Sequence, residues 1–185
     1  MKNKILLCVA TKEEAELLLP SGLEDLPVYT LITGIGFGNT INAIKDYAFD
    51  DVIVLNIGFV GATKDLDINN LYNINVSLLG PNDNGLSPTR HLKLIKDMDT
   101  LPCVSVTDFE TNPDRFYPTT CYTKDYVVDM ELYPIASYFD NVYAIKVPSD
   151  RGDIKDYYNQ KNNRARLNIL KARIKDIILE LCDNE

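Results

Sequence analysis

Two segments decide the fold, Tyr126-Val-Val-Asp-Met-Glu131 and Val142-Tyr-Ala-Ile-Lys-Val-Pro-Ser-Asp150. Each begins as a β-type run and ends near a carboxylate, Glu131 in the first and Asp150 in the second. Residues 132–139 between them have a helical pattern, so we interpret the whole as a strand–helix–strand unit of a parallel sheet. Ligands in open α/β sheets bind beyond the carboxyl ends of the strands. We therefore expect Glu131 and Asp150 to lie on one edge of the sheet, at the functional site.

The composition excludes several classes of protein. The 185 residues are 45% hydrophobic, which is enough for one sizeable core, and we predict one domain over residues 1–185. The formal net charge of -8 argues against a nucleic-acid partner, because such a surface needs clustered Lys and Arg. The apolar runs are too short for a signal peptide or a membrane span. We expect a cytoplasmic chain with no membrane partner.

The cysteines do not indicate a metal site. Cys8, Cys103, Cys121 and Cys182 are far apart in the sequence, and His91 is the one histidine. This spacing fits neither a zinc site nor a disulfide framework. Cys8 and Cys103 lie within apolar runs, so we predict that both are core residues.

Apolar β-type runs alternate with helical patterns along the chain. The runs cover residues 5–10, 28–33, 52–57, 74–79 and 103–107, and a long amphipathic helix is predicted over about residues 164–182. A Pro, Asn, Asp and Gly-rich surface loop is expected at 80–88. This alternation predicts a single α/β domain with a mixed, largely parallel central sheet and helices on both sides.

Two glycine-rich turns follow predicted strands. Residues 33–40 read Thr-Gly-Ile-Gly-Phe-Gly-Asn-Thr and lead into a helix with apolar positions at Ile41, Ile44 and Ala48. Glycines allow close approach of the backbone to a ligand, and a helix start exposes N–H groups. The second turn is Gly58-Phe-Val-Gly61. Two such turns on one sheet edge indicate a pocket, and we expect Phe59, Val60 and Gly61 to contact a substrate.

Five blocks of sequence together resemble a known superfamily. They are Ala10-Thr-Lys-Glu-Glu14, Gly34-Ile-Gly36, Asn56-Ile-Gly-Phe-Val-Gly61, Val128-Asp-Met-Glu131 and Ser149-Asp150. Their order and spacing resemble the purine nucleoside phosphorylases and nucleosidases, and most closely the methylthioadenosine/S-adenosylhomocysteine nucleosidases. The chain is shorter than typical members around residues 19–28 and 80–101. The resemblance implies a homodimer, and members use the second of these regions for dimer contacts.

The resemblance also implies roles for individual residues. Asp150, with Ser149 beside it, resembles the aspartate that protonates the leaving purine at N7, which requires a raised pKa. Glu131 resembles the glutamate that binds the ribose hydroxyls, with Met130 packing on the sugar. Glu14 resembles the residue that activates the attacking water. Phe109 corresponds to the base-stacking aromatic when one residue is skipped, and no metal or organic cofactor is implied.

Structural explanations compete with these roles. Thr11 and Glu14 have the spacing of a helix capping box, so Glu14 could simply complete it. Glu131 stands at a predicted helix start, where a carboxylate favours the helix dipole. Asp150 could cap a turn. Three carboxylates arriving at one sheet edge are harder to explain in this way than any one of them.

The position of the arginines bears on the reaction. Phosphorylases of the superfamily hold phosphate with arginines near the first glycine turn, whereas no arginine precedes Arg90 in this chain. Water is therefore the expected nucleophile, and we predict a hydrolase acting on a purine nucleoside, which the resemblance implies is a 5′-modified adenosine. A nucleoside phosphorylase, a futalosine hydrolase and a degenerate module that binds a nucleoside without turnover are the alternatives.

Overall fold

A computed structural model describes residues 2–47, 51–63, 65–80, 88–110, 112–116 and 124–183. The strands are β1 (Ile5–Val9), β2 (Val28–Ile32), β3 (Ile53–Ala62), β4 (Tyr72–Leu79), β5 (Thr89–His91), β6 (Thr100–Ser105), β7 (Val127–Asp129) and β8 (Val142–Asp150). The α-helices are α1 (Lys12–Leu18), α2 (Phe37–Ile44), α4 (Leu132–Tyr138), α5 (Ile154–Lys161) and α6 (Arg164–Asp183), and Pro113–Phe116 form a 3-10 turn. The predicted single α/β domain is confirmed.

The sheet is mixed and partly closed on itself. β3 pairs in parallel with β1 and β8, and β1 pairs in parallel with β2. β3 also pairs with β7, β7 with β6, β6 with β4, and β4 with β8, so that these strands form a closed ring. Closure depends on the length of β3, because its last residues pair on one side with β8 and on the other with β7. β5 pairs antiparallel with the outer edge of β4.

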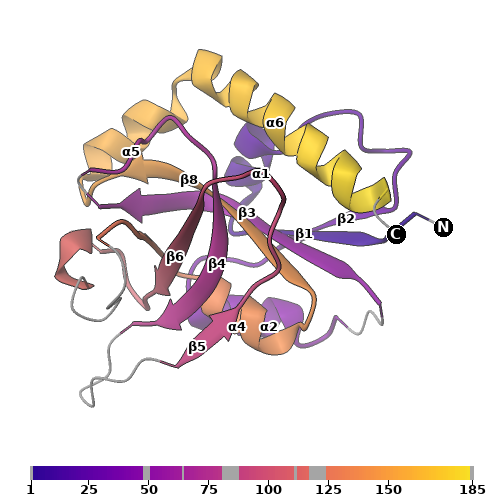
Figure 1. The fold of residues 1–185 in the computed structure, drawn as a ribbon, viewed down its shortest axis with the longest axis horizontal. Coiled ribbons are helices and arrows are strands. Elements are labelled where there is room, and N and C mark those ends of the chain that lie inside the picture. Colours follow the sequence, from indigo (N-terminus) through magenta and orange to yellow (C-terminus); the bar gives the residue numbers. More distant parts are fainter. Residues whose placement is uncertain are drawn as a thin grey trace.

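Helices cover the sheet on both sides, as predicted. In Figure 1, α1, α5 and α6 lie on one side of the strands, and α2 and α4 lie on the other. Two apolar clusters correspond to these layers: one includes Ile44 of α2 and Ile135 of α4, and the other includes Leu18 of α1 and Ile174 of α6. Within the described ranges, no helix is long and apolar enough to cross a membrane.

One expectation about strand direction is wrong. β7, α4 and β8 follow one another as predicted, but β7 runs antiparallel to β3 whereas β8 runs parallel to it. They are therefore not a parallel strand–helix–strand unit. The hydrophobic pattern shows that a segment is buried but does not specify the direction of its partner. Glu131 and Asp150 still converge, because Gly61 near the end of β3 pairs with Val128 on one side and Asp150 on the other.

Two further expectations can be compared with the structure. Cys8 and Cys103 are completely buried, and both are free thiols. Of the apolar positions of the predicted helix, Ile44 is buried, whereas Ile41 is 50% exposed. Ala48, Cys121 and most of the predicted loop at 80–88 lie outside the described residues.

The first glycine turn gives a test of the backbone. Gly34 has φ +76°, and a methyl group at this position would lie 2.7 Å from Cβ of Asn39. Gly34→Ala should therefore lower the free energy of unfolding by at least about 1–2 kcal/mol, the usual cost of a left-handed residue. Gly38, in the helix that follows, has open space around its Cα, so Gly38→Ala should instead add up to about 1 kcal/mol. Urea unfolding of both variants measures the difference, and effects of the same sign would contradict this geometry.

Candidate active site

A cavity of about 240 Å³ lies at the carboxyl ends of β1, β3, β6, β7 and β8. Every site residue expected from the sequence lines it: Glu14, Phe59, Val60, Gly61, Phe109, Met130, Glu131, Ser149 and Asp150. They come from five separate parts of the chain, which the strand pairings help to bring together. The three carboxylates that we expected on one sheet edge therefore share one cavity.

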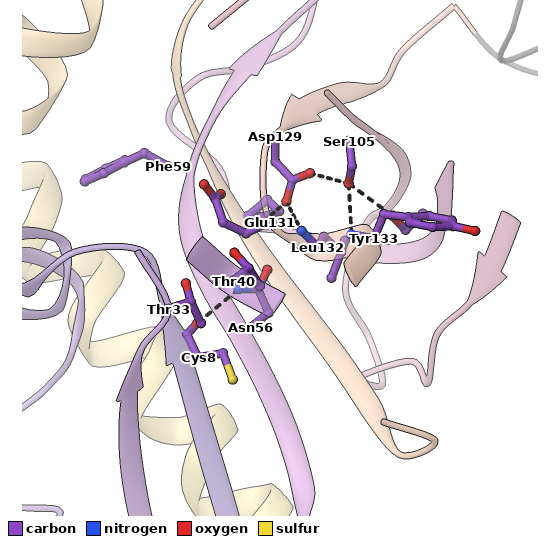
Figure 2. Close-up of polar contacts among 12 residues, drawn as sticks. Cys8, Thr33, Thr40, Asn56, Phe59, Ser105, Asp129, Glu131, Leu132 and Tyr133 are labelled. Atoms are coloured by element: carbon purple, nitrogen blue, oxygen red, sulfur yellow. Dashed lines mark hydrogen bonds and ion pairs between the residues drawn. The ribbon is translucent and has the colours of Figure 1, made fainter. Parts of the chain in front are cut away.

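Glu131 lies at the amino end of α4 and is only 9% exposed. Its Oε1 accepts a hydrogen bond of 2.8 Å from the backbone N–H of Gly36, at the amino end of α2. Burial, and then the neighbouring Asp129, raise the pKa of Glu131 to about 7. Its side chain does not cap its own helix, which weakens the purely structural explanation. In Figure 2 the carboxylate points away from the Asp129 network, to the side on which Phe59 lies.

Asp150 ends β8 and is 3% exposed. Its Oδ1 accepts from the backbone N–H of Gly152 at 2.8 Å, and its Oδ2 accepts from the Ser149 hydroxyl at 2.8 Å. These hydrogen bonds favour the ionised form, but burial outweighs them and the pKa of Asp150 is raised. The group is thus oriented by two donors and still holds its proton more tightly than an exposed aspartate does.

Glu14 lies in the first turn of α1 and is 7% exposed. The capping box is half formed: the Thr11 hydroxyl accepts from the N–H of Glu14 at 3.1 Å, as predicted. The Glu14 carboxylate does not return to Thr11, since its Oε1 accepts from the N–H of Phe59 at 3.2 Å. Its Oε2 is buried without a hydrogen-bond partner among the described residues. Burial raises the pKa of Glu14, so the site contains three carboxyl groups with raised pKa values.

A buried ion pair lies beside these carboxylates. Lys146, in the middle of β8, is 1% exposed, and its Nζ is 2.8 Å from Oδ2 of Asp129 in β7. Oδ2 of Asp129 also accepts from the N–H of Leu132. The other carboxylate oxygen of Asp129, Oδ1, accepts from the Ser105 hydroxyl at 2.5 Å (Figure 2). The positive charge of Lys146 lowers the pKa of both Glu14 and Glu131, against the effect of burial.

Aromatic and aliphatic side chains form the rest of the wall. Phe59 and Tyr157 meet edge to face, with ring centroids 6.0 Å apart. Burial, followed by the nearby Glu14, raises the pKa of Tyr157 to about 12, so its hydroxyl stays protonated. Ile35, Phe109 and Ile154 line the cavity and are also about half exposed, which gives the opening an apolar rim. In the described part of the chain, no group of three or more His, Cys, Asp and Glu side chains could hold a metal ion.

Sequence reasoning missed several of these residues. Lys146 had a visible signal, because a lysine within the apolar run at 142–147 needs a buried partner. Ile154, Ile35 and Glu110 had none, since each is an ordinary residue of a helix start or a loop, and only the folded chain brings it to the cavity.

Solved structures match the chain along its length, although no protein-family model and no curated protein sequence does. A variant of MTAN from Chlamydia trachomatis bound to MTA is 20% identical, with a TM-score of 0.74 over 98% of this chain and 100% of that chain. The 5′-methylthioadenosine/S-adenosylhomocysteine nucleosidase from Helicobacter pylori with butyl-thio-DADMe-Immucillin-A is 16% identical, with a TM-score of 0.75 over 98% and 100%. A futalosine hydrolase mutant of Helicobacter pylori is 15% identical, with a TM-score of 0.72 over 97% and 100%. The chain has the fold of these proteins.

Removal of the buried lysine charge should be costly. Lys146→Met leaves Asp129 buried without its counter-ion, and breaking such a pair typically costs roughly 3–5 kcal/mol of unfolding free energy. The matched control is Lys2→Met, which breaks an ion pair with Asp183 in which both side chains are more than half exposed, and should cost less than about 1 kcal/mol. Urea denaturation measures both. Equal losses in the two variants would contradict the buried pair.

The raised pKa of Glu131 has a consequence for stability. The folded chain binds the Glu131 proton up to pH about 7, whereas the unfolded chain releases it near 4.5. The ionised form is therefore destabilising, and wild-type stability falls as pH rises between these values, by a total of ~3 kcal/mol. Glu131→Gln removes this dependence, and its amide oxygen can still accept from the N–H of Gly36. The unfolding free energy of the variant minus that of wild type should therefore increase between pH 5 and pH 8. Glu16→Gln, at an exposed position of α1, is the control. A difference between wild type and Glu131→Gln that does not change with pH would be incompatible with the buried carboxyl.

Proposed function

We propose that residues 1–185 form a single nucleosidase domain that hydrolyses the N-glycosidic bond of a purine nucleoside, with a 5′-modified adenosine as substrate. The observation that carries this proposal is the convergence of Glu14, Glu131 and Asp150 on one cavity, each buried and each with a raised pKa. Hydrolysis of a glycosidic bond needs a proton donor, a base and a group that stabilises positive charge on the sugar. The nucleosides and inhibitors bound by proteins of the same fold support it.

Asp150 is the general acid in this proposal. The bond between C1′ of the sugar and N9 of the purine breaks with its electron pair moving to the base, so protonation at N7 makes the base a better leaving group. Burial raises the pKa of Asp150, so the carboxyl group holds its proton more tightly than an exposed aspartate does, and the Ser149 hydroxyl and the Gly152 N–H fix its direction.

Glu131 and Glu14 act on the sugar side. The free oxygen of Glu131 accepts from the ribose hydroxyls, and its negative charge stabilises the oxocarbenium-like transition state. The unpartnered Oε2 of Glu14 takes a proton from a water molecule, whose oxygen then forms the new bond to C1′. The products are the free base and the free sugar.

Water rather than phosphate is the nucleophile. No lysine or arginine belongs to the described residues that line the cavity, whereas phosphate binding usually requires cations and favours bidentate arginine. The Glu14 carboxylate would also repel an anion. This argues against the nucleoside phosphorylase alternative. A futalosine hydrolase activity and a binding module without turnover remain the other candidates, and the homodimer and the cytoplasmic location stay predictions.

Asp150→Asn tests the assignment of the general acid. The amide keeps the shape of the side chain but cannot donate a proton to N7 as an acid, so turnover of methylthioadenosine should fall by roughly 10²–10⁴-fold while adenine binding persists. The control is Asp153→Asn, which changes a nearby carboxylate that caps α5 through the N–H of Lys155, a role that Asn performs equally well.

Release of adenine, followed by coupled spectrophotometry, measures both variants. The control should stay within about threefold of wild type. Asp150→Asn activity within the same range would mean that Asp150 is not the acid.

A further inference from the structure

We propose that Glu110 selects the base: its carboxylate accepts a hydrogen bond from the 6-amino group of adenine and rejects 6-oxopurines. This inference deepens the proposed function, on which it rests, by naming the feature of the base that the cavity reads. Glu110 follows Phe109 in the segment after β6, and both residues line the cavity. No role was expected for it from the sequence.

The Glu110 carboxylate is held in place. Its side chain is 9% exposed. Oε1 accepts from the N–H of Asn112 at 2.7 Å, and Oε2 is 2.7 Å from Nε of Arg115. Each carboxylate oxygen has two lone-pair directions, so each retains one for a further donor. Glu110 is thus an oriented acceptor whose charge is balanced by the exposed Arg115 rather than by a group inside the cavity.

The segment that holds Glu110 lies close to Asp150. A methyl group at Gly61 would be 3.6 Å from Oδ1 of Asp150 and 3.6 Å from Cγ of Pro113. Pro113 directly follows Asn112, whose N–H binds the Glu110 carboxylate. Pro113, in the segment that fixes Glu110, and the carboxylate of Asp150 therefore approach the same glycine.

This pair of groups is complementary to one edge of adenine. On that edge adenine presents N7 as an acceptor and the 6-amino group as a donor, whereas guanine presents two acceptors, N7 and O6. Protonated Asp150 supplies the donor for N7, and Glu110 supplies an acceptor beside it. A 6-oxo group would place its oxygen against the Glu110 carboxylate, which can only accept. Protonation at N7 also makes the amino group a stronger donor, so the contact with Glu110 strengthens as the bond breaks.

Binding of free bases tests this inference without requiring turnover. Calorimetric titration of the full chain with adenine and with hypoxanthine should give a dissociation constant for adenine at least on the order of tenfold lower, because a well-placed pair of contacts on a base edge discriminates by this much or more. Glu110→Gln, whose amide can donate to O6, should bring the two constants to within about threefold. The matched control, Asp108→Asn, changes an exposed carboxylate in the same segment that bonds to Thr107 and does not line the cavity, and it should keep the wild-type ratio.

Two results would overturn the inference. One is wild-type protein that binds hypoxanthine as tightly as adenine, which is decisive even if the Glu110 variant does not fold. The other is a folded Glu110→Gln variant that retains the wild-type ratio. An adenine preference that depends on Glu110, in a protein that releases no base from methylthioadenosine, would support this inference and contradict the proposed function, so the two failures can be told apart.

Discussion

The site depends on the buried ion pair between Lys146 and Asp129. It joins β8 to β7, the two strands that flank the end of β3 and lead to Asp150 and Glu131. Because Asp129 also accepts from the first N–H of α4, the same carboxylate fixes the helix start beside Glu131. Two charges taken out of water are stable only when their hydrogen bonds are satisfied, and here Ser105 supplies the remaining donor. The arrangement of the acidic residues therefore follows from one satisfied polar network.

Beside this network the cavity contains three carboxyl groups whose ionised forms are disfavoured by burial. Burial raises the pKa values of Glu14, Glu131 and Asp150, which means that the fold resists their ionisation. Lys146 acts in the opposite direction on the two glutamates. A proton donor on the base side and negative charge on the sugar side are what departure of a purine requires. The strain at this site is consistent with selection for chemistry rather than for stability.

The sequence was enough to predict the α/β class, the buried strands and the amphipathic α6, because hydrophobic periodicity reports burial directly. The prediction that the carboxylates lie together is also confirmed. The reason given for it was partly wrong, because it assumed a parallel strand–helix–strand unit and β7 runs antiparallel to β3. Hydrophobic periodicity does not specify the direction of a strand or the closure of the sheet into a ring. It could not show that the Glu14 carboxylate leaves its capping box for the N–H of Phe59, because only folding brings these distant residues together. Glu110 and Arg115 are close in the sequence, but their ion pair depends on the local path of the chain into the 3-10 turn at Pro113–Phe116, which periodicity does not predict.

The proposed reaction transfers water to C1′ of a purine nucleoside. The most direct measurement is the reaction of the purified protein with methylthioadenosine in water enriched in oxygen-18, with and without phosphate, followed by mass spectrometry of both products. We expect one heavy oxygen in the released sugar, none in adenine, and the same rate in the two buffers. Release of adenine only with phosphate, with a sugar 1-phosphate that lacks the heavy oxygen at C1′, would contradict the claim.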